Sequence, residues 1–128
     1  MYRFEKLIVW QKAMDFCLLV YEKTKSYPKE EMFGLTSQFR RAASSIPLNI
    51  AEGSACHTKK EFVQFLTIAL RSQYECVTIT KLSQRLGFLN KSDFEIIEEK
   101  SAVVGRLVQA LINSLKNRSK NQQLTTKN

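Results

Sequence analysis

The sequence predicts an all-α protein built from four helices with short connections. Apolar residues recur every three or four positions in four separate segments, as they do on the buried side of an amphipathic helix. No segment shows the sustained alternation and hairpin turns that are typical of strands. The 128 residues suffice for one domain, and no apolar run reaches the roughly 18 residues that span a membrane. We expect a soluble, cytoplasmic protein, because the charged N-terminal segment does not resemble a secretory signal.

The first helix is predicted over residues 7–26. Pro28 follows closely, and the residue before a proline avoids helical geometry, so the helix should end before it. The apolar stripe of this helix consists of Trp10, Ala13, Cys17, Val20 and Thr24, flanked by Val9, Phe16 and Tyr21.

A second helix is predicted over residues 35–54, although Pro47 lies inside it. Its apolar stripe keeps the same phase on both sides of the proline, whereas a true break would let the two halves lose register. We therefore expect one continuous, kinked helix. The proline removes the hydrogen bond to the Ala43 carbonyl, which costs about 3 kcal/mol in a helix interior, and the hydroxyls of Ser44 and Ser45 are candidates to satisfy that carbonyl. The stripe consists of Leu35, Phe39, Ala42 or Ala43, Ile46 and Ile50.

A row of polar side chains lies beside this stripe, about 110° away around the helix axis at about 100° per residue. This polar row consists of Gln38, Arg41, Ser45, Asn49 and Glu52. It is either a solvated flank with weak pairing between successive turns, or a contact surface for another helix or subunit. Serine and asparagine are mediocre helix formers, and a plain exposed face more usually carries lysine and glutamate, which supports the contact surface.

The third helix is predicted over residues 59–86. Thr58 and Glu61 match a capping box at its start, and Gly87 stands where a left-handed residue would end it. The inner stripe becomes more polar toward its C-terminal half, which indicates a wetter contact or a partner chain there. This stripe consists of Phe62, Phe65, Leu66, Ala69, Gln73, Cys76, Val77, Thr80 and Ser83.

The fourth helix is predicted over residues 93–116, with Ser92 and Glu95 as its capping box. It completes a bundle domain of residues 1–116. The remaining residues, 117–128, form a basic polar tail that we expect to be a frayed, solvated end. The stripe of the fourth helix consists of Phe94, Ile97, Ser101, Val104, Val108, Leu111 and Leu115.

The chain carries 20 basic and 12 acidic residues, a formal net charge of +8. A positive field of this kind favours nucleic acid, anionic lipid or an acidic protein patch. Half of the excess comes from residues 116–128, so the signal from the body is weaker. Four cations of the third helix nevertheless share an arc of about 80° opposite the apolar stripe, without a carboxylate among them. They are Lys60, Arg71, Lys81 and Arg85, with Thr67 and Thr78 between them, and they form either a solvated exterior or a phosphate-binding face.

The cysteines Cys17, Cys56 and Cys76 are odd in number and widely spaced, so we expect reduced thiols rather than a disulfide framework. Cys56 precedes His57, but a zinc site needs about four nitrogen or sulfur ligands and His57 is the only histidine. We expect no metal ion and no cofactor.

Four segments of the chain resemble one protein family. They are VWQKA at 9–13, YPKEEMFGLTSQFRRAASSIPLNIAEGS at 27–54, EFVQFLTIAL at 61–70 and LGFL at 86–89. They resemble the small four-helix bundle proteins encoded in intervening sequences of bacterial large-subunit ribosomal RNA genes, over about residues 4 to 115. The resemblance implies an up-down four-helix bundle that assembles into a ring-like homo-oligomer, a pentamer, with a basic surface and nucleic-acid binding. Arg71 stands where the family commonly has glycine, so we expect its side chain to point outward.

These features favour a non-catalytic protein that binds RNA or DNA through the nucleic-acid backbone, since no base-reading motif is present. The alternative is a protein-protein scaffold or an accessory subunit for a nucleic-acid-handling enzyme. Catalysis is the least supported class. A two-metal nuclease needs clustered carboxylates, and only Glu52 and Glu75 are candidates for a common inner region. A general acid-base nuclease would depend on His57, which has no obvious second proton-transfer group nearby.

Overall fold

The computed structural model describes the backbone of residues 1–126 and the side chains of residues 1–117. Four α-helices and two short 3-10 helices make up the described chain, and none of these residues forms a strand. The elements in order are η1 (Arg3–Lys6), α1 (Ile8–Thr24), η2 (Lys29–Glu31), α2 (Leu35–Ser54), α3 (Lys59–Arg85) and α4 (Lys91–Thr126).

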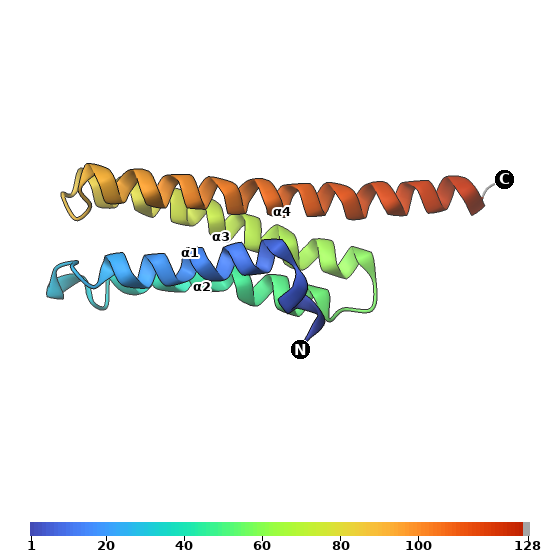
Figure 1. The fold of residues 1–128 in the computed structure, drawn as a ribbon, viewed down its shortest axis with the longest axis horizontal. Helices are drawn as coiled ribbons and strands as arrows, with labels where there is room; N and C mark the ends of the chain where they lie inside the picture. Colours follow the sequence, from blue (N-terminus) through green and yellow to red (C-terminus); the bar gives the residue numbers. More distant parts are fainter. Residues whose placement is uncertain (127–128) are drawn as a thin grey trace.

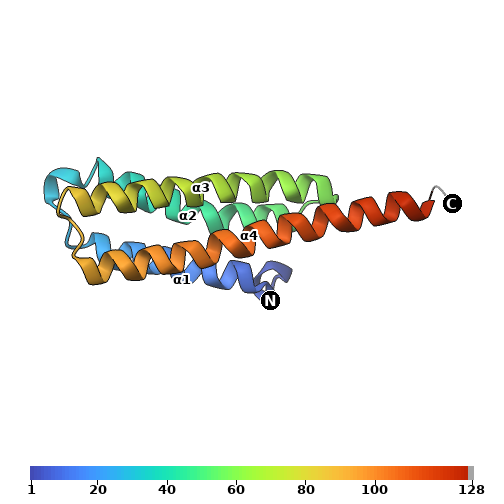
Figure 2. The ribbon, with the colours of Figure 1, turned by 90° about the horizontal axis from the view of Figure 1, so that it is seen from above.

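The four α-helices form an up-down bundle. Successive helices run in opposite directions and lie side by side in both views (Figures 1 and 2). Each helix packs against the next along the chain, and α1 also packs against α4, which closes the bundle. The C-terminal part of α4 continues beyond the ends of the other three helices (Figure 1). No helix among the described residues is long and apolar enough to cross a membrane.

The core contains most of the predicted stripes, with differences on three helices. On α3 Ile79 is buried, and the predicted Phe62, Phe65 and Val77 are only half-buried. On α4 Ile112 is buried, and the predicted Phe94 and Leu111 are only half-buried. On α1 the buried side chains are those of Val9, Ala13, Phe16, Val20 and Thr24. Trp10 and Cys17, which were predicted in the stripe, are only half-buried at its edge. The predicted stripe of α2 is buried throughout, including both Ala42 and Ala43.

Pro47 lies inside one uninterrupted helix, as predicted from the constant phase of the stripe. The expected role of the neighbouring hydroxyls was wrong. Ser44 donates to the Arg41 carbonyl at 3.2 Å, and the Ser45 hydroxyl contacts Asn49 and Ser72. Neither hydroxyl bonds the Ala43 carbonyl, because each is engaged with another partner one turn away or across the helix interface.

The two ends of α3 follow their sequence signals. The Thr58 hydroxyl accepts a hydrogen bond from the Glu61 backbone amide at 3.1 Å and donates to the Glu61 carboxylate at 3.0 Å. At the other end Gly87 has φ of +80°, in the left-handed region where glycine carries no steric penalty. The Gly87 and Phe88 amides donate back to the Gln84 and Ser83 carbonyls, which forms a Schellman motif.

Both predicted limits of α4 were wrong. The helix begins at Lys91, and the Asn90 side-chain oxygen accepts from the Asp93 amide at 2.8 Å, so Asn90 rather than Ser92 is the cap. Asparagine caps helices as well as serine does, and the helix begins at the cap that comes first in the chain rather than at the predicted capping box of Ser92 and Glu95. The helix also continues through Thr126 instead of ending near 116, since no glycine or proline interrupts that stretch. The expectation for the side chains of the basic tail, from residue 118 on, lies outside the described residues.

Candidate nucleic-acid interface

The four predicted cations of α3 are all exposed on its outer side. The side chains that point away from the core are those of Lys60, Arg71, Lys81 and Arg85. The exposure of Arg71 agrees with the prediction that its side chain points outward. The two threonines between them are engaged with their own helix, because Thr67 and Thr78 donate to backbone carbonyls four residues earlier. The two threonine hydroxyls are therefore already bonded, whereas the four cations are available to a ligand on this face. We call these four residues the α3 cation row.

The cations of this row differ in their surroundings. Lys81 Nζ lies 2.7 Å from Glu98 Oε1 on α4 and 5.9 Å from the centre of the Phe94 ring. The arc is free of carboxylates on α3, as predicted, but the neighbouring helix supplies one. Lys60, Arg71 and Arg85 have no ion pair with any side chain up to residue 117. Three of the four positive charges are thus not neutralised by a described neighbour.

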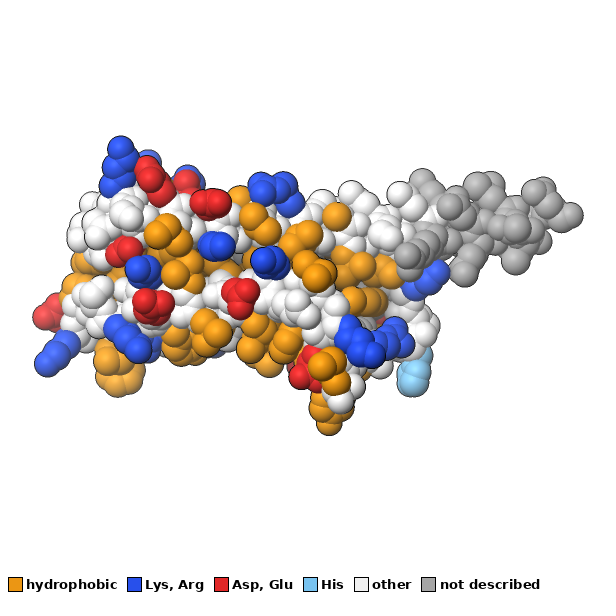
Figure 3. Space-filling model, in the orientation of Figure 1, with side chains coloured by type: hydrophobic (Ala, Val, Ile, Leu, Met, Phe, Trp, Pro, Cys, Tyr) orange, Lys and Arg blue, Asp and Glu red, His pale blue; other side chains and the backbone are white. Residues whose placement is uncertain are grey.

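Charge is not distributed evenly over the rest of the surface. On the face shown in Figure 3, basic and acidic side chains are interspersed over the middle of the bundle. Basic side chains gather beside the single histidine, His57, near the end where the N-terminus lies (Figure 3). A ligand that carries negative charge is therefore favoured at this end and along the α3 cation row.

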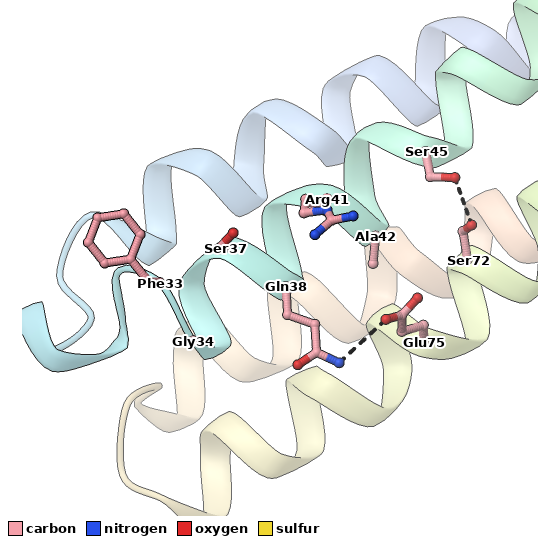
Figure 4. A pocket seen from close by; sticks show the side chains of 9 residues that line it. All are labelled: Phe33, Gly34, Ser37, Gln38, Arg41, Ala42, Ser45, Ser72 and Glu75. Atoms are coloured by element: carbon pink, nitrogen blue, oxygen red, sulfur yellow. Dashed lines mark hydrogen bonds between the residues drawn. The ribbon is translucent and has the colours of Figure 1, made fainter.

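The polar row of α2 lies along the seam between α2 and α3. Gln38 donates to Glu75 at 3.5 Å, and Ser72 donates to Ser45 at 2.9 Å, so two members reach the facing helix (Figure 4). Asn49 donates to both the carbonyl and the hydroxyl of Ser45. The row is therefore not a plain solvated flank over its whole length.

An open groove of about 580 Å³ runs beside these contacts. Arg41 contributes a cation to it and Glu75 a carboxylate, and Phe33 lies at its end with 96% of its surface exposed. The groove is lined by Phe33, Gly34, Ser37, Gln38, Arg41, Ala42, Ser45, Ser72 and Glu75 (Figure 4). Glu52, the last member of the polar row, lines a different cavity near the N-terminus.

The polar half of α3 faces α4 inside the bundle. Gln73 is 4% exposed and donates to both the carbonyl and the hydroxyl of Ser101, at 3.1 and 3.0 Å. Thr80 is fully buried and donates to the Cys76 carbonyl. Gln73 and Thr80 therefore pair within this chain, whereas the buried Ser83 hydroxyl has no hydrogen-bond partner among the described residues.

The three cysteines are free, as expected from their number and spacing. Burial raises the pKa of the Cys76 thiol far above its ordinary value and also raises the pKa of Cys17. The pKa of Cys56 is raised by burial and by the nearby carboxylate of Glu61. Up to residue 126 there is no group of three or more His, Cys, Asp or Glu side chains placed to hold a metal ion.

Two sets of residues near these surfaces were not predicted as site residues from the sequence. Ser72 and Glu75 line the groove, at the spacing of neighbours on one helix face. The expectation that Glu52 and Glu75 share an inner region was wrong, because both are exposed and they line different cavities. Tyr2, Arg3 and Phe4 line the second cavity, and their alternation of aromatic and basic side chains was the available signal. A segment before the first helix offers no periodicity that would have placed them beside α2.

The fold and these surfaces define a small, helical bundle protein with a cationic outer face and a polar interhelical groove. The chain belongs to the 23S rRNA-intervening sequence protein family, whose model matches residues 5–110. The resemblance found in the sequence is thereby confirmed.

A solved structure with the same fold comes from Bacteroides thetaiotaomicron. It is a protein with unknown function from the S23 ribosomal protein family, at 23% sequence identity and a TM-score of 0.76. The match covers 83% of this chain and 96% of that one, so the whole bundle is shared. The comparison with curated proteins gave no match.

Proposed function

We propose that this protein is a non-catalytic homo-oligomer that binds RNA or DNA through the nucleic-acid backbone. The observation that supports it best is the α3 cation row, in which Lys60, Arg71 and Arg85 are exposed and have no acidic partner among the described side chains. Cations on one outer face neutralise phosphates without reading bases, and membership of a family named for 23S rRNA intervening sequences is consistent with such a ligand.

The proposed oligomer uses the face formed by α2 and α3 beside the groove. Leu48 lies two turns after Arg41 on the same side of α2, and it is 59% exposed. On α3, Ile68 lies one turn before Ser72 and Leu82 two turns after Glu75, and both are about half exposed. Phe33 lines the groove, and the other three apolar side chains lie on the same sides of α2 and α3 as groove residues. This composition favours burial against a second copy.

Oligomerisation would strengthen nucleic-acid binding without any new type of contact. A ring-like arrangement, such as a pentamer, repeats the α3 cation row around one particle, so that a bound strand meets several rows at once. The effective affinity then exceeds that of one row, because each further contact is intramolecular.

The test measures the mass of the purified protein and its affinity for unrelated RNA and DNA. Light scattering should give a particle mass that is a multiple of the 14.8 kDa mass of one chain. Leu48→Glu should lower the number of chains in the particle. Fluorescence anisotropy at about 50 and about 200 mM salt should show affinity that falls steeply with salt. Arg71→Ala with Arg85→Ala should weaken binding more than Lys12→Ala with Lys25→Ala, which removes the same charge from exposed positions elsewhere.

A second candidate function is a scaffold or accessory subunit for a nucleic-acid-handling enzyme. It is favoured by the exposed Phe33 and Leu48 beside the polar groove, which would suit a protein partner as well as a second copy. If the logarithm of the binding constant hardly changed with the logarithm of the salt concentration, nucleic-acid binding would be refuted and this second function would remain. Degradation of RNA or DNA by the pure protein, abolished in Glu52→Gln, would refute the non-catalytic assignment.

A further inference from the structure

The second cavity lies where η1 meets the end of α2 and the connection to α3. It is open to solvent and has a volume of about 610 Å³. Residues 2–4 and residues 51–57 contribute to it, so the site depends on the fold that brings η1 beside the end of α2. Its lining consists of Tyr2, Arg3, Phe4, Ala51, Glu52, Ser54, Ala55, Cys56 and His57.

An exposed pair of aromatic rings stands at this cavity. The rings of Tyr2 and Phe4 are stacked, with centres 5.7 Å apart and planes within 8° of each other. Phe4 packs in turn against Trp10 at 5.1 Å, which ties the pair to α1. Tyr2 nevertheless remains 74% exposed, so its ring is supported from one side only and is open on the other.

Hydrogen bonds hold the segment that carries these rings. The Tyr2 amide donates to the Glu5 carboxylate at 2.6 Å, and the Gln11 side chain donates to the Glu5 carbonyl at 2.9 Å. The aromatic surface is therefore presented in a defined position before any ligand arrives. Stacking of a nucleic-acid base on such a ring contributes about 1 to 3 kcal/mol and tolerates any base.

The polar groups of the cavity divide into two kinds. The Arg3 guanidinium and a ring N–H of His57 can donate hydrogen bonds, and neither residue forms an ion pair within the part of the chain whose side chains are described. Glu52 lines the same cavity, and an ionised carboxylate only accepts hydrogen bonds. A phosphate is thus attracted to Arg3 and His57, while Glu52 suits the exocyclic amino group of a base.

The cavity and the α3 cation row are neighbours along the chain. His57, which lines the cavity, lies three residues before Lys60, the first cation of that row. We propose that the cavity binds one unpaired nucleotide of a single strand of RNA or DNA. The base stacks on Tyr2, its amino group donates to Glu52, and its phosphate contacts Arg3 and His57. This inference depends on the proposed function, because the strand bound along α3 supplies the nucleotide.

The experiment compares a single-stranded oligonucleotide that carries 2-aminopurine with a hairpin duplex of equal charge, using the full chain with any tag at the C-terminus. Tyr2→Ala should weaken single-strand binding about 5- to 150-fold, the equivalent of about 1 to 3 kcal/mol, and leave duplex binding unchanged. Tyr2→Phe, which keeps the ring, should retain the wild-type affinity. Stacking should quench the 2-aminopurine fluorescence, and Tyr2→Ala should abolish this quenching.

Two further measurements make the assignment specific. Glu52→Gln should remove a preference for adenine- and cytosine-rich strands over uracil-rich ones, because uracil has no exocyclic amino group. Free adenosine monophosphate should compete far more weakly than the strand, since it lacks the contacts along α3, and equal competition would show a mononucleotide site instead.

Failure of this inference is distinguishable from failure of the proposed function. Unchanged single-strand affinity and quenching in Tyr2→Ala would refute the cavity site, while salt-dependent binding that disappears in the Arg71 and Arg85 double variant would still support the α3 face. If the wild-type protein binds neither nucleic acid at low salt, both are wrong. Because Tyr2 is largely exposed, its substitution should leave the thermal unfolding transition unchanged.

Discussion

Gln73 on α3 donates one side-chain amide group to both the carbonyl and the hydroxyl of Ser101 on α4. Both residues are almost completely buried, so this polar contact lies within the apolar interface of the two helices. A buried amide without such partners would cost about 1 to 3 kcal/mol, and the contact therefore favours one register of α3 against α4 over its alternatives.

Gly105→Ala should destabilise the bundle through this contact. A Cβ atom at Gly105 would come within 2.9 Å of the Gln73 amide. We expect the free energy of unfolding to fall by about 1 to 2 kcal/mol. Overpacking destabilises by about 1 to 3 kcal/mol, and the better helix propensity of alanine offsets at most about 1 kcal/mol of this loss. Urea unfolding measures the change.

Arg106→Ala is the control for this substitution, because Arg106 is an exposed neighbour of Gly105 on the same helix. The control should change stability by less than about 0.5 kcal/mol. A Gly105→Ala variant as stable as the wild type would show that the position of Gln73 is not constrained.

Asn90→Ala should destabilise the protein, whereas Ser92→Ala should not. The Asn90 side chain accepts from the Asp93 amide at the start of α4, and loss of a cap costs about 0.5 to 2 kcal/mol. Ser92 is exposed inside the first turn of the helix. Thermal unfolding of the two variants compares them directly, and the reverse order would restore Ser92 as the cap.

The stability of the protein should fall as the pH rises above about 8.5, the ordinary pKa of a thiol. Burial raises the pKa of Cys76 in the folded state, so above pH 8.5 the unfolded chain releases a proton that the folded chain keeps. The resulting loss is at most about 1.4 kcal/mol per pH unit for this thiol.

The free energy of unfolding in urea, measured at several pH values between about 8 and 10, tests this dependence. Cys76→Ala should flatten the decline, although it lowers stability at neutral pH by leaving space in the core. Cys56→Ala, at a less buried position, should flatten it less. Equal slopes in the wild type and Cys76→Ala would contradict the role assigned to the buried thiol.

Arg71 and Lys81 should contribute unequally to nucleic-acid binding. Arg71 has no ion pair among the described residues, while Glu98 already neutralises part of the Lys81 charge at 2.7 Å. In a salt titration, the logarithm of the binding constant falls linearly with the logarithm of the salt concentration. Arg71→Ala should make this slope shallower by about 0.9 for each phosphate that the protein no longer neutralises, and Lys81→Ala should change the slope by less. Glu98→Gln should strengthen binding, because it frees Lys81. Equal effects of the two alanine substitutions would show that the Lys81–Glu98 pair does not persist in solution.

Local sequence signals predicted much of the architecture. The phase of the apolar stripe from Leu35 to Ile50 was enough to predict one helix across Pro47, because a stripe remains buried only if its register is kept. Thr58 and Gly87 marked the two ends of α3 correctly, since caps satisfy backbone groups of their own helix. Where two cap signals competed, at Asn90 and Ser92, the sequence offered no means of choosing.

The sequence by itself therefore determined the four helices and the outward position of Arg71, because helix faces depend on neighbours three or four residues apart, and it determined the net positive charge through composition alone. Only the tertiary structure decided which polar residues pair across helices: Gln73 with Ser101, Ser45 with Ser72 and Lys81 with Glu98. It also brought Tyr2 and Arg3 beside Glu52 and His57. Such contacts join residues far apart in the chain. They depend on the relative rotation and axial position of the helices once their apolar faces pack together, and no local sequence pattern determines these two quantities.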